Sequence, residues 1–319
     1  MSDQARVSPN TALKVLALLA LAPIAAAAAL FVVAYSRAPQ TTDLTARTFA
    51  LERAHRASAL PLSRIAPTLR NAVVATEDER FYEHRGVDLI ALLRAVPFDV
   101  THLSFAQGAS TITEQLAKLI YLDGNDHSAI RKTEDVVLGY RLGHHYPHEA
   151  ILNAYLNIVY LGSGQYGVES ASRHYFGRNA AQLNLSQASL LAGLIQAPSS
   201  YDPQTNPQGA RTRQIEVLRS MVRNGFATED EAAAAVGSTL QLKSGTALPA
   251  ISGISFAPGA PFDSTGLVAA MLMLILAITA LVLARVLRPT LHAKGFLRAA
   301  FVGLMIVSAF TAAHSIQVI

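Results

Sequence analysis

Three long stretches without Asp, Glu, Lys or Arg constrain the fold of this chain more than any other feature. The first runs from Val15 to Tyr35, the second from Leu267 to Ala284, and the third covers 299–319. The first is long enough to cross a hydrocarbon core of about 30 Å as one helix. It exceeds the roughly 7–15 apolar residues at the centre of a cleaved signal peptide, so we predict a transmembrane anchor at 15–35, with the signal peptide as its alternative.

A short basic segment sets the expected topology. Residues 285–298 carry Arg285, Arg288, Lys294 and Arg298 between two apolar stretches. Short loops rich in Lys and Arg stay in the cytoplasm. We therefore expect the 1–14 N-terminus and the 285–298 loop to be cytoplasmic, with transmembrane helices at 267–284 and 299–319. The long segment from about 37 to 262 then lies outside the cytoplasm.

The segment between the membrane spans predicts one mainly α-helical domain at 36–242. Apolar residues recur at helical spacing after Glu149, and Thr228 with Glu231 forms a capping box at a helix start. Residues 243–266 are rich in Gly, Ser and Pro, which indicates a linker.

Composition excludes several classes of function. The chain has no Cys, which removes disulfides, thiolate catalysis and Cys-ligated zinc. A formal net charge of +4 and a pI of about 9.4 favour anionic partners such as phospholipid or phosphate groups. No basic stripe with interleaved aromatic residues is present, so we do not expect nucleic-acid binding.

The stretch Ala75-Thr-Glu-Asp-Glu-Arg-Phe-Tyr-Glu-His-Arg-Gly-Val-Asp88 gathers many ionisable groups in a chain that is only 15% charged. Glu77 follows the apolar run 72–75, so we expect it at the end of a buried helix. Partial burial and the neighbouring Asp78 would raise its pKa toward the working pH of a general base. A solvated helix end is the alternative. We expect Glu79 and Glu83 to be surface charges.

Two further stretches suit a phosphate ligand. Gln107-Gly-Ala-Ser-Thr111 is a small-residue segment that leads into a helix, whose first N–H groups bind phosphate well. Lys118 lies one turn beyond Gln115, on the same predicted face. Arg131 and Lys132 form a second basic pair. An ordinary helix cap followed by an exposed Lys is the alternative.

Five blocks in order carry a resemblance to a known family. They are "EDxxFxxHxG" at 77–86, "GxSTIxxQxxK" at 108–118, "RKxxE" beginning at Arg131, a block at 151–177, and a block at 183–213. Together, over roughly residues 55–235, they resemble the family 51 glycosyltransferases. These are the peptidoglycan glycosyltransferase domains of bifunctional penicillin-binding proteins and of monofunctional transglycosylases. The fourth block, with Tyr155 and Asn157, is interpreted mainly as scaffold.

The resemblance implies a lysozyme-like helical domain that polymerises lipid II into glycan strands by inverting transfer. Glu77 would be the base and Asp135 the second catalytic carboxylate. The donor's pyrophosphate and the substrate would be bound by further residues of the same blocks, namely Asp78, Phe81, His84, Gly108, Ser110, Thr111, Gln115, Lys118, Arg131 and Lys132. Asp78 and His84 would orient the site through hydrogen bonds, with a purely structural His as the alternative. A divalent cation, Mg²⁺ or Mn²⁺, is an optional helper, and no organic cofactor is expected.

The membrane spans fit this interpretation, because a lipid-linked substrate confines the reaction to the membrane surface. We expect residues 91–100 to dip into the headgroups. The helices at 267–284 and 299–319 are candidates for contact with other cell-wall proteins. Bifunctional relatives continue into a transpeptidase domain, whereas only the linker and two apolar segments follow here, so transpeptidase activity is not expected.

The sequence departs from the family pattern at three positions. Asp135 stands where the third block has Glu, and Gly143 and Asn153 stand where relatives commonly carry Glu. A side chain one methylene shorter can displace a catalytic group by about 1 Å, which can cost about a hundredfold in rate. A catalytically diverged protein that binds lipid II or scaffolds cell-wall enzymes is therefore the main alternative, and a lysozyme-like hydrolase is the third.

Overall fold

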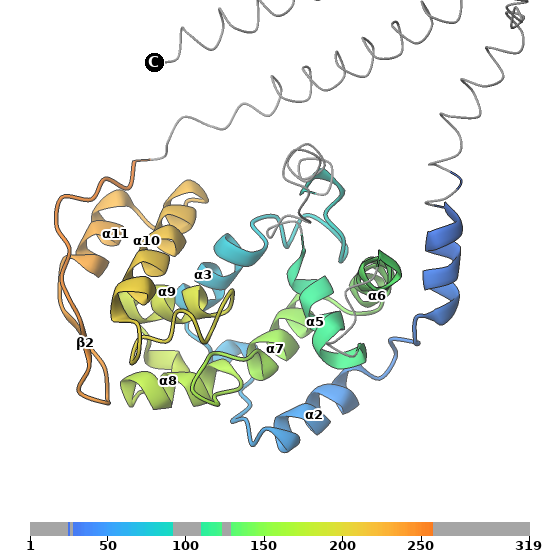
Figure 1. Cartoon of the computed structure of the whole chain (residues 1–319), viewed down its shortest axis with the longest axis horizontal. Helices are drawn as coiled ribbons and strands as arrows, with labels where there is room; N and C mark the ends of the chain where they lie inside the picture. Colours follow the sequence, from blue (N-terminus) through green and yellow to red (C-terminus); the bar gives the residue numbers. More distant parts are fainter. Residues whose placement is uncertain (1–24, 26–27, 92–109, 123–128, 258–319) are drawn as a thin grey trace, which may run out of the picture. The chain divides into compact units, whose positions relative to one another are not determined.

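The computed structural model of the chain describes residue 25 and residues 28–91, 110–122 and 129–257. The chain divides into two compact units, and the named elements all belong to the unit formed by residues 31–95 and 105–261. In chain order (Figure 1) they are α2 (Leu44–Ala54), η1 (Leu62–Arg64), α3 (Pro67–Glu77), α5 (Ile112–Tyr121), α6 (Ala129–His145), α7 (His148–Ile158), α8 (Val168–Phe176), η2 (Ala180–Gln182), α9 (Leu185–Leu194), α10 (Pro207–Arg223), α11 (Glu229–Val236), β1 (Leu240–Gln241) and β2 (Ala247–Leu248). The prediction of a mainly α domain is confirmed.

Helix α9 lies in the core of a group of helices that includes α3 and α10. All its residues from Gln187 to Leu194 are buried, and such an all-round apolar helix is stable only inside a core. Its first turn is closed by a capping box between Asn184 and Gln187. Helices α3 and α10 both pack against α9 and against each other. The buried face of α3, which includes Ala72, Val73 and Val74, is thereby fixed.

Helix α5 lies in a second group of helices, together with α6 and α7. It packs against α6 and α7, and Figure 1 shows it between these two helices. Its buried residues include Ile112, Leu116 and Ile120, which repeat every four positions and so share one face. The Thr111 side chain caps the start by accepting a hydrogen bond from the Glu114 N–H, as expected for the N-cap position.

The C-terminal part of the domain extends beyond the predicted boundary at residue 242. Strands β1 and β2 form an antiparallel hairpin that pairs Leu240 with Leu248, and both Leu248 and Phe256 are buried. The guanidinium of Arg211, itself fully buried, donates to the carbonyls of Leu248 and Pro249. The prediction that the linker begins at 243 is therefore wrong, because two apolar side chains beyond that point belong to the core.

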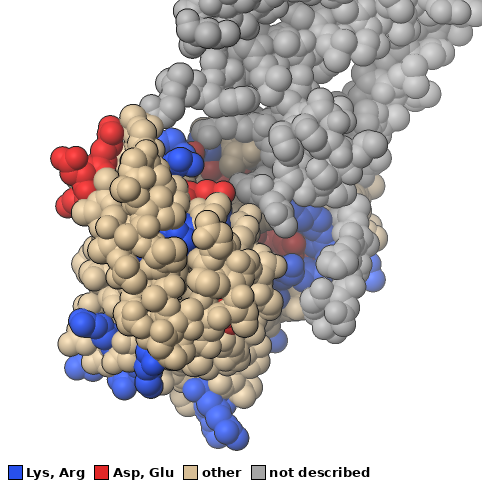
Figure 2. All heavy atoms as spheres, turned by 60° about the vertical axis from the view of Figure 1, so that its left-hand side comes forward, with Lys and Arg blue, Asp and Glu red and all other residues tan. Residues whose placement is uncertain are grey.

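Local sequence signals gave two helices correctly. Helix α7 covers the predicted periodic segment, and α11 begins after the capping box between Thr228 and Glu231. On the face shown in Figure 2, most of the described surface is uncharged, and charged side chains stand in separate groups. This face has no continuous basic stripe of the kind that follows a nucleic-acid backbone.

The predicted membrane spans fall mostly outside the described residues. Of the span predicted at 15–35, residue 25 and residues 28–35 are described, and they are helical; the segments at 267–284 and 299–319 lie outside. Among the described residues, no helix combines the length and the apolar character needed to cross a bilayer. The segment 91–100, apart from Ala91, also lies outside.

Candidate functional site

Glu77 is the last residue of α3, as the sequence predicts. Its carboxylate accepts a hydrogen bond of 2.9 Å from the side-chain amide of Gln115 on α5. Burial raises the pKa of Glu77 above its usual value. The Gln115 hydrogen bond and the positive charge of Arg213 oppose this, and the neighbouring Asp78 adds to it. The result is a carboxylate that holds a proton more readily than an exposed one, which suits a general base.

Gln115 is itself held from the other side. The hydroxyl of Tyr155 on α7 donates to the Gln115 side-chain oxygen at 2.6 Å. Tyr155 is fully buried, and burial followed by the Glu77 charge raises its pKa well above the usual range. A chain of hydrogen bonds therefore runs from Tyr155 through Gln115 to Glu77, joining α7, α5 and α3.

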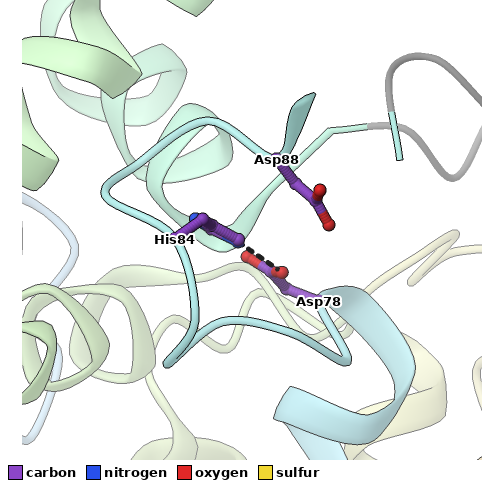
Figure 3. Close-up of side chains that lie close together, drawn as sticks. All are labelled: Asp78, His84 and Asp88. Carbon is purple, nitrogen blue, oxygen red and sulfur yellow. Dashed lines mark hydrogen bonds and ion pairs between the residues drawn. The ribbon is translucent and has the colours of Figure 1, made fainter. Parts of the chain in front are cut away.

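Asp78 joins the end of α3 to the start of α5. One carboxylate oxygen accepts from the Ile112 N–H at 3.0 Å, and the other lies 2.9 Å from Nε2 of His84 (Figure 3). Burial lowers the pKa of His84, but the hydrogen bond and charge of Asp78 outweigh it, so the net shift is upward. Asp78 thus connects His84 of the loop to the start of α5 through hydrogen bonds.

Phe81 does not take the role expected for it. Its side chain is fully buried and makes edge contacts with His84 and with His148, whose Nε2 bonds the His84 carbonyl. A ring without exposed surface packs the loop and offers no face to a ligand, so we assign Phe81 to packing in place of binding. Glu79 and Glu83 are exposed, as the sequence predicts.

The same loop contains a group that resembles a metal site in composition. Ligand atoms of Asp78, His84 and Asp88 lie within 4.8 Å of one another (Figure 3). However, Asp88 is paired with the guanidinium of Arg80 and accepts from two backbone N–H groups, while both oxygens of Asp78 are already bonded. An arginine at the carboxylate repels a cation. These residues do not fit a resident divalent cation.

A second group of polar side chains lies where α5 meets α6. Thr111 donates to the Gly86 carbonyl at 2.7 Å, which ties the loop after α3 to the start of α5. Nζ of Lys132 donates to the Ser110 hydroxyl at 2.7 Å and lies 3.6 Å from the Glu114 carboxylate. Two of the predicted phosphate ligands, Ser110 just before α5 and Lys132 on α6, are therefore in direct contact.

Glu114 is a residue that the sequence reasoning missed. Its side chain is 5% exposed, and burial raises its pKa to about 7, against the opposing charge of Lys132. Asp135 and Asp78 add to the upward shift. Nothing in a single sequence marks this position, because an acidic residue in the first turn of a helix is ordinarily explained by the helix dipole.

Arg131 and Asp135 lie one turn apart on α6 and form an ion pair of 2.6 Å. Both side chains are nearly buried, with 7% and 14% of their surface exposed. Lys118, in the last turn of α5, is exposed. Gly108 lies outside the described residues. Arg213 on α10 is a second missed residue: it ends the fifth block, and its charge acts on Glu77.

The departure at Gly143 has a steric explanation. A Cβ atom at this position would lie 2.4 Å from the Arg85 carbonyl carbon and 2.5 Å from the Gly86 nitrogen. The backbone of the loop after Phe81 therefore packs directly on α6, and no larger residue fits there without a shift. Asn153 contributes its carbonyl to the Asn157 side chain, whose amide also bonds the backbone of Leu60 at both ends.

Comparisons with known proteins cover the same part of the chain. The profile of the family described as Transglycosylase matches residues 43–222. A Cupriavidus necator protein, provisionally named a transglycosylase, is 42% identical over 191 residues, which cover 59% of this chain and 81% of that protein. Penicillin-binding protein 1A of Neisseria flavescens is 42% identical over 160 residues, and penicillin-binding protein 1F of Bacillus subtilis is 38% identical over 181. These matches cover 50% and 57% of this chain but only 20% and 25% of the penicillin-binding proteins.

Proposed function

This chain belongs to the transglycosylase family of glycosyltransferases, and on that premise we propose that it polymerises lipid II into peptidoglycan glycan strands. The reaction is an inverting transfer from a polyprenyl-pyrophosphate-linked donor to the 4-hydroxyl of the acceptor N-acetylglucosamine. The observation that supports it most is the state of Glu77: a partly buried carboxylate with a raised pKa, at the end of α3, held by one neutral amide. Among the described residues it forms no salt bridge, and the more distant charge of Arg213 only opposes the upward shift of its pKa.

Glu77 takes the proton of the acceptor 4-hydroxyl as that oxygen bonds to the donor's C1, and the C1–oxygen bond to the pyrophosphate breaks. The leaving group departs with its negative charge. Lys118, Lys132 and Arg131 supply the positive charge that stabilises it. Lys132 is pre-positioned for this by its contacts with Ser110 and Glu114, and Arg131 by its pair with Asp135.

The membrane part of the proposal rests on the sequence. The apolar runs at 15–35, 267–284 and 299–319 would anchor the chain in the bacterial inner membrane, with the domain on the outer face of that membrane, where a lipid-linked donor and acceptor are confined. Residues 91–100 would enter the headgroups. We propose no transpeptidase activity for the chain, and the C-terminal helices would bind other cell-wall proteins.

The test is polymerisation of labelled lipid II by the purified, detergent-solubilised full chain, run beside Glu77→Gln. Glu83→Gln is the matched control, because Glu83 is an exposed carboxylate of the same loop. We expect polymer and released polyprenyl pyrophosphate from the wild type and from Glu83→Gln, and a rate at least about a hundredfold lower from Glu77→Gln. Full activity in Glu77→Gln would refute the assigned base. Cleavage of glycan without pyrophosphate release would indicate a hydrolase.

One observation favours a second candidate, a relative that binds lipid II without turning it over. Asp135 replaces the longer Glu of the family pattern, and its carboxylate is bound to Arg131. If the wild type binds lipid II and forms no polymer while Asp135→Glu forms polymer, the chain is a diverged binder one methylene from activity. Equal polymerisation by both proteins would show that the shorter carboxylate suffices.

A further inference from the structure

Tyr155 was interpreted from the sequence as scaffold, yet its hydroxyl is directed at the site. The ring is fully buried on α7, and the hydroxyl is 2.6 Å from the side-chain oxygen of Gln115. A buried tyrosine needs a partner for its hydroxyl, and a backbone carbonyl serves as well as any. Tyr175 on α8, for example, donates to the Leu161 carbonyl. Tyr155 instead bonds Gln115, the side chain that donates to the Glu77 carboxylate.

The amide of Gln115 has two unlike ends, an oxygen that accepts and an NH₂ that donates. Because its oxygen is taken by the Tyr155 hydroxyl, its NH₂ is turned toward the Glu77 carboxylate, at 2.9 Å. The reverse orientation would place the amide oxygen against a carboxylate oxygen, which is favourable only when the carboxyl is protonated. The orientation of this one amide therefore decides which protonation state of Glu77 is stabilised.

We propose that Tyr155 is a positioning residue for the base: its hydroxyl fixes the Gln115 amide so that Glu77 always meets an N–H donor. The inference rests on the role proposed for Glu77. Burial and the nearby Glu77 charge raise the pKa of Tyr155 well above its usual range, so the phenol remains a donor across the pH range of activity. Among the described residues, the side-chain amide of Gln115 hydrogen-bonds only Tyr155 and Glu77, so the Tyr155 hydroxyl is the group that orients it.

Other charges act on Glu77 and have to be separated from this effect. Arg213 of α10 lowers the pKa of Glu77 and Asp78, at the end of α3, raises it, while burial raises it most. Replacing Tyr155 by Phe alters none of these groups and keeps the buried ring. A change in the titration of Glu77 in Tyr155→Phe therefore reports the amide alone.

The experiment compares Tyr155→Phe with Tyr175→Phe in the detergent-solubilised full chain. The two tyrosines match well, because both are fully buried and each hydroxyl donates one hydrogen bond. The first readout is the titration of Glu77, followed by ¹³C NMR of carboxyl-labelled glutamate and assigned by its absence in Glu77→Gln. The second is the dependence of kcat/KM for polymerisation on pH.

We expect the pKa of Glu77 to rise by about one unit in Tyr155→Phe and to stay unchanged in Tyr175→Phe. A base must be deprotonated to act, so the acidic limb of kcat/KM moves to higher pH by about the same amount, a tenfold loss at any pH on that limb. The rate recovers above it. A merely structural role would lower the rate equally at every pH.

A double-mutant cycle tests whether the effect passes through Gln115. In a Gln115→Met background no amide is left to orient, so Tyr155→Phe should no longer shift the Glu77 titration. An unchanged pKa in the single Tyr155→Phe variant, or an equal shift in both backgrounds, would overturn the inference. The titration needs no turnover. If the wild type fails to polymerise lipid II, the proposed function fails while the positioning of Glu77 by Tyr155 is still measured.

Discussion

Two consecutive residues of α5, Glu114 and Gln115, contact different neighbours on two sides of the helix. Gln115 contacts Glu77 of α3 and Tyr155 of α7, and this side contains one carboxylate held by neutral groups. Glu114 contacts Lys132 of α6, near Asp135, and this side is a network of opposite charges. We call them the neutral side and the charged side of α5.

The difference between the two sides concerns what a buried carboxylate is able to do. The Lys132 ammonium at 3.6 Å opposes the burial that raises the pKa of Glu114 to about 7, and it holds this carboxylate in an ion pair. An amide donor stabilises Glu77 by much less, so its carboxylate remains available for a proton. Burial raises the pKa of both groups, although Glu77 is only partly buried, and the partner of each carboxylate distinguishes the proposed base from a charge that positions a lysine.

The largest effect we expect is a difference in polymerisation rate between Glu77→Gln and Glu114→Gln. Glu77→Gln should lower kcat by about 10²–10⁴-fold, the usual contribution of a general base. Glu114→Gln is the same substitution on the charged side of α5. It should lower kcat by less than about tenfold, because Lys132 keeps its bond to Ser110. Initial rates of lipid II polymerisation at one pH measure both. Equal losses would show that the charged side also takes part in proton transfer.

The second prediction concerns the backbone contact that holds the charged side together. Gly86 has a φ of +90°, and a Cβ there would lie 1.9 Å from the Gly139 carbonyl oxygen on α6. Gly86→Ala should therefore destabilise the domain by about 4 kcal/mol or more, or prevent folding. Gly164→Ala is the matched control, because Gly164 has a φ of +72° with open space around it, and should cost about 1–2 kcal/mol. Thermal unfolding of both variants checks the difference.

The sequence predicted the parts of the site that local signals determine. The apolar run before Glu77 predicted the end of α3, the small-residue segment 107–111 predicted the helix that begins after it, and the capping box at Thr228 predicted α11. Each of these depends on residues within one helical turn of one another, so spacing alone is informative.

Contacts between distant elements could not be predicted in the same way. Lys132 meets Ser110, Tyr155 meets Gln115, and Arg213 acts on Glu77, all across gaps in sequence that carry no periodic signal. The hairpin at 240–248 was missed for the same reason, since its two short strands are held by the buried Arg211 of α10. The motif resemblance assigned Phe81 to substrate binding, whereas its ring is fully buried. A motif does not distinguish an aromatic ring that packs in the core from one that contacts a ligand.

The third prediction uses the pH dependence of stability to test the charged side. The pKa of Glu114 is raised from 4.5 to about 7 in the folded protein. The protonated form is thus favoured by folding, so the associated stability is present below pH 4.5 and is lost as the pH rises through about 7. The loss should be on the order of 3 kcal/mol.

Glu114→Gln removes this group, so its melting temperature should match that of the wild type near pH 4.5 and exceed it near pH 8. Glu229→Gln, at an exposed position of α11, is the control and should follow the wild type at both values. A wild type that is as stable as Glu114→Gln at pH 8 would mean that Lys132 fully compensates the burial of Glu114, and that the charged side is an ordinary ion pair.

The smallest effect compares the loss of one hydroxyl on each side. Ser110→Ala removes one partner of Lys132, whose side chain is 42% exposed and retains Glu114 and water. The loss of such a bond costs about 0.5–1.5 kcal/mol, so KM should rise a few-fold with kcat and its pH profile unchanged. Tyr155→Phe removes one hydroxyl from the neutral side, where no water replaces it, and should move the pH profile. If Ser110→Ala also moves the pH profile, the two sides of α5 are coupled, and the distinction between a base side and a charge side no longer holds.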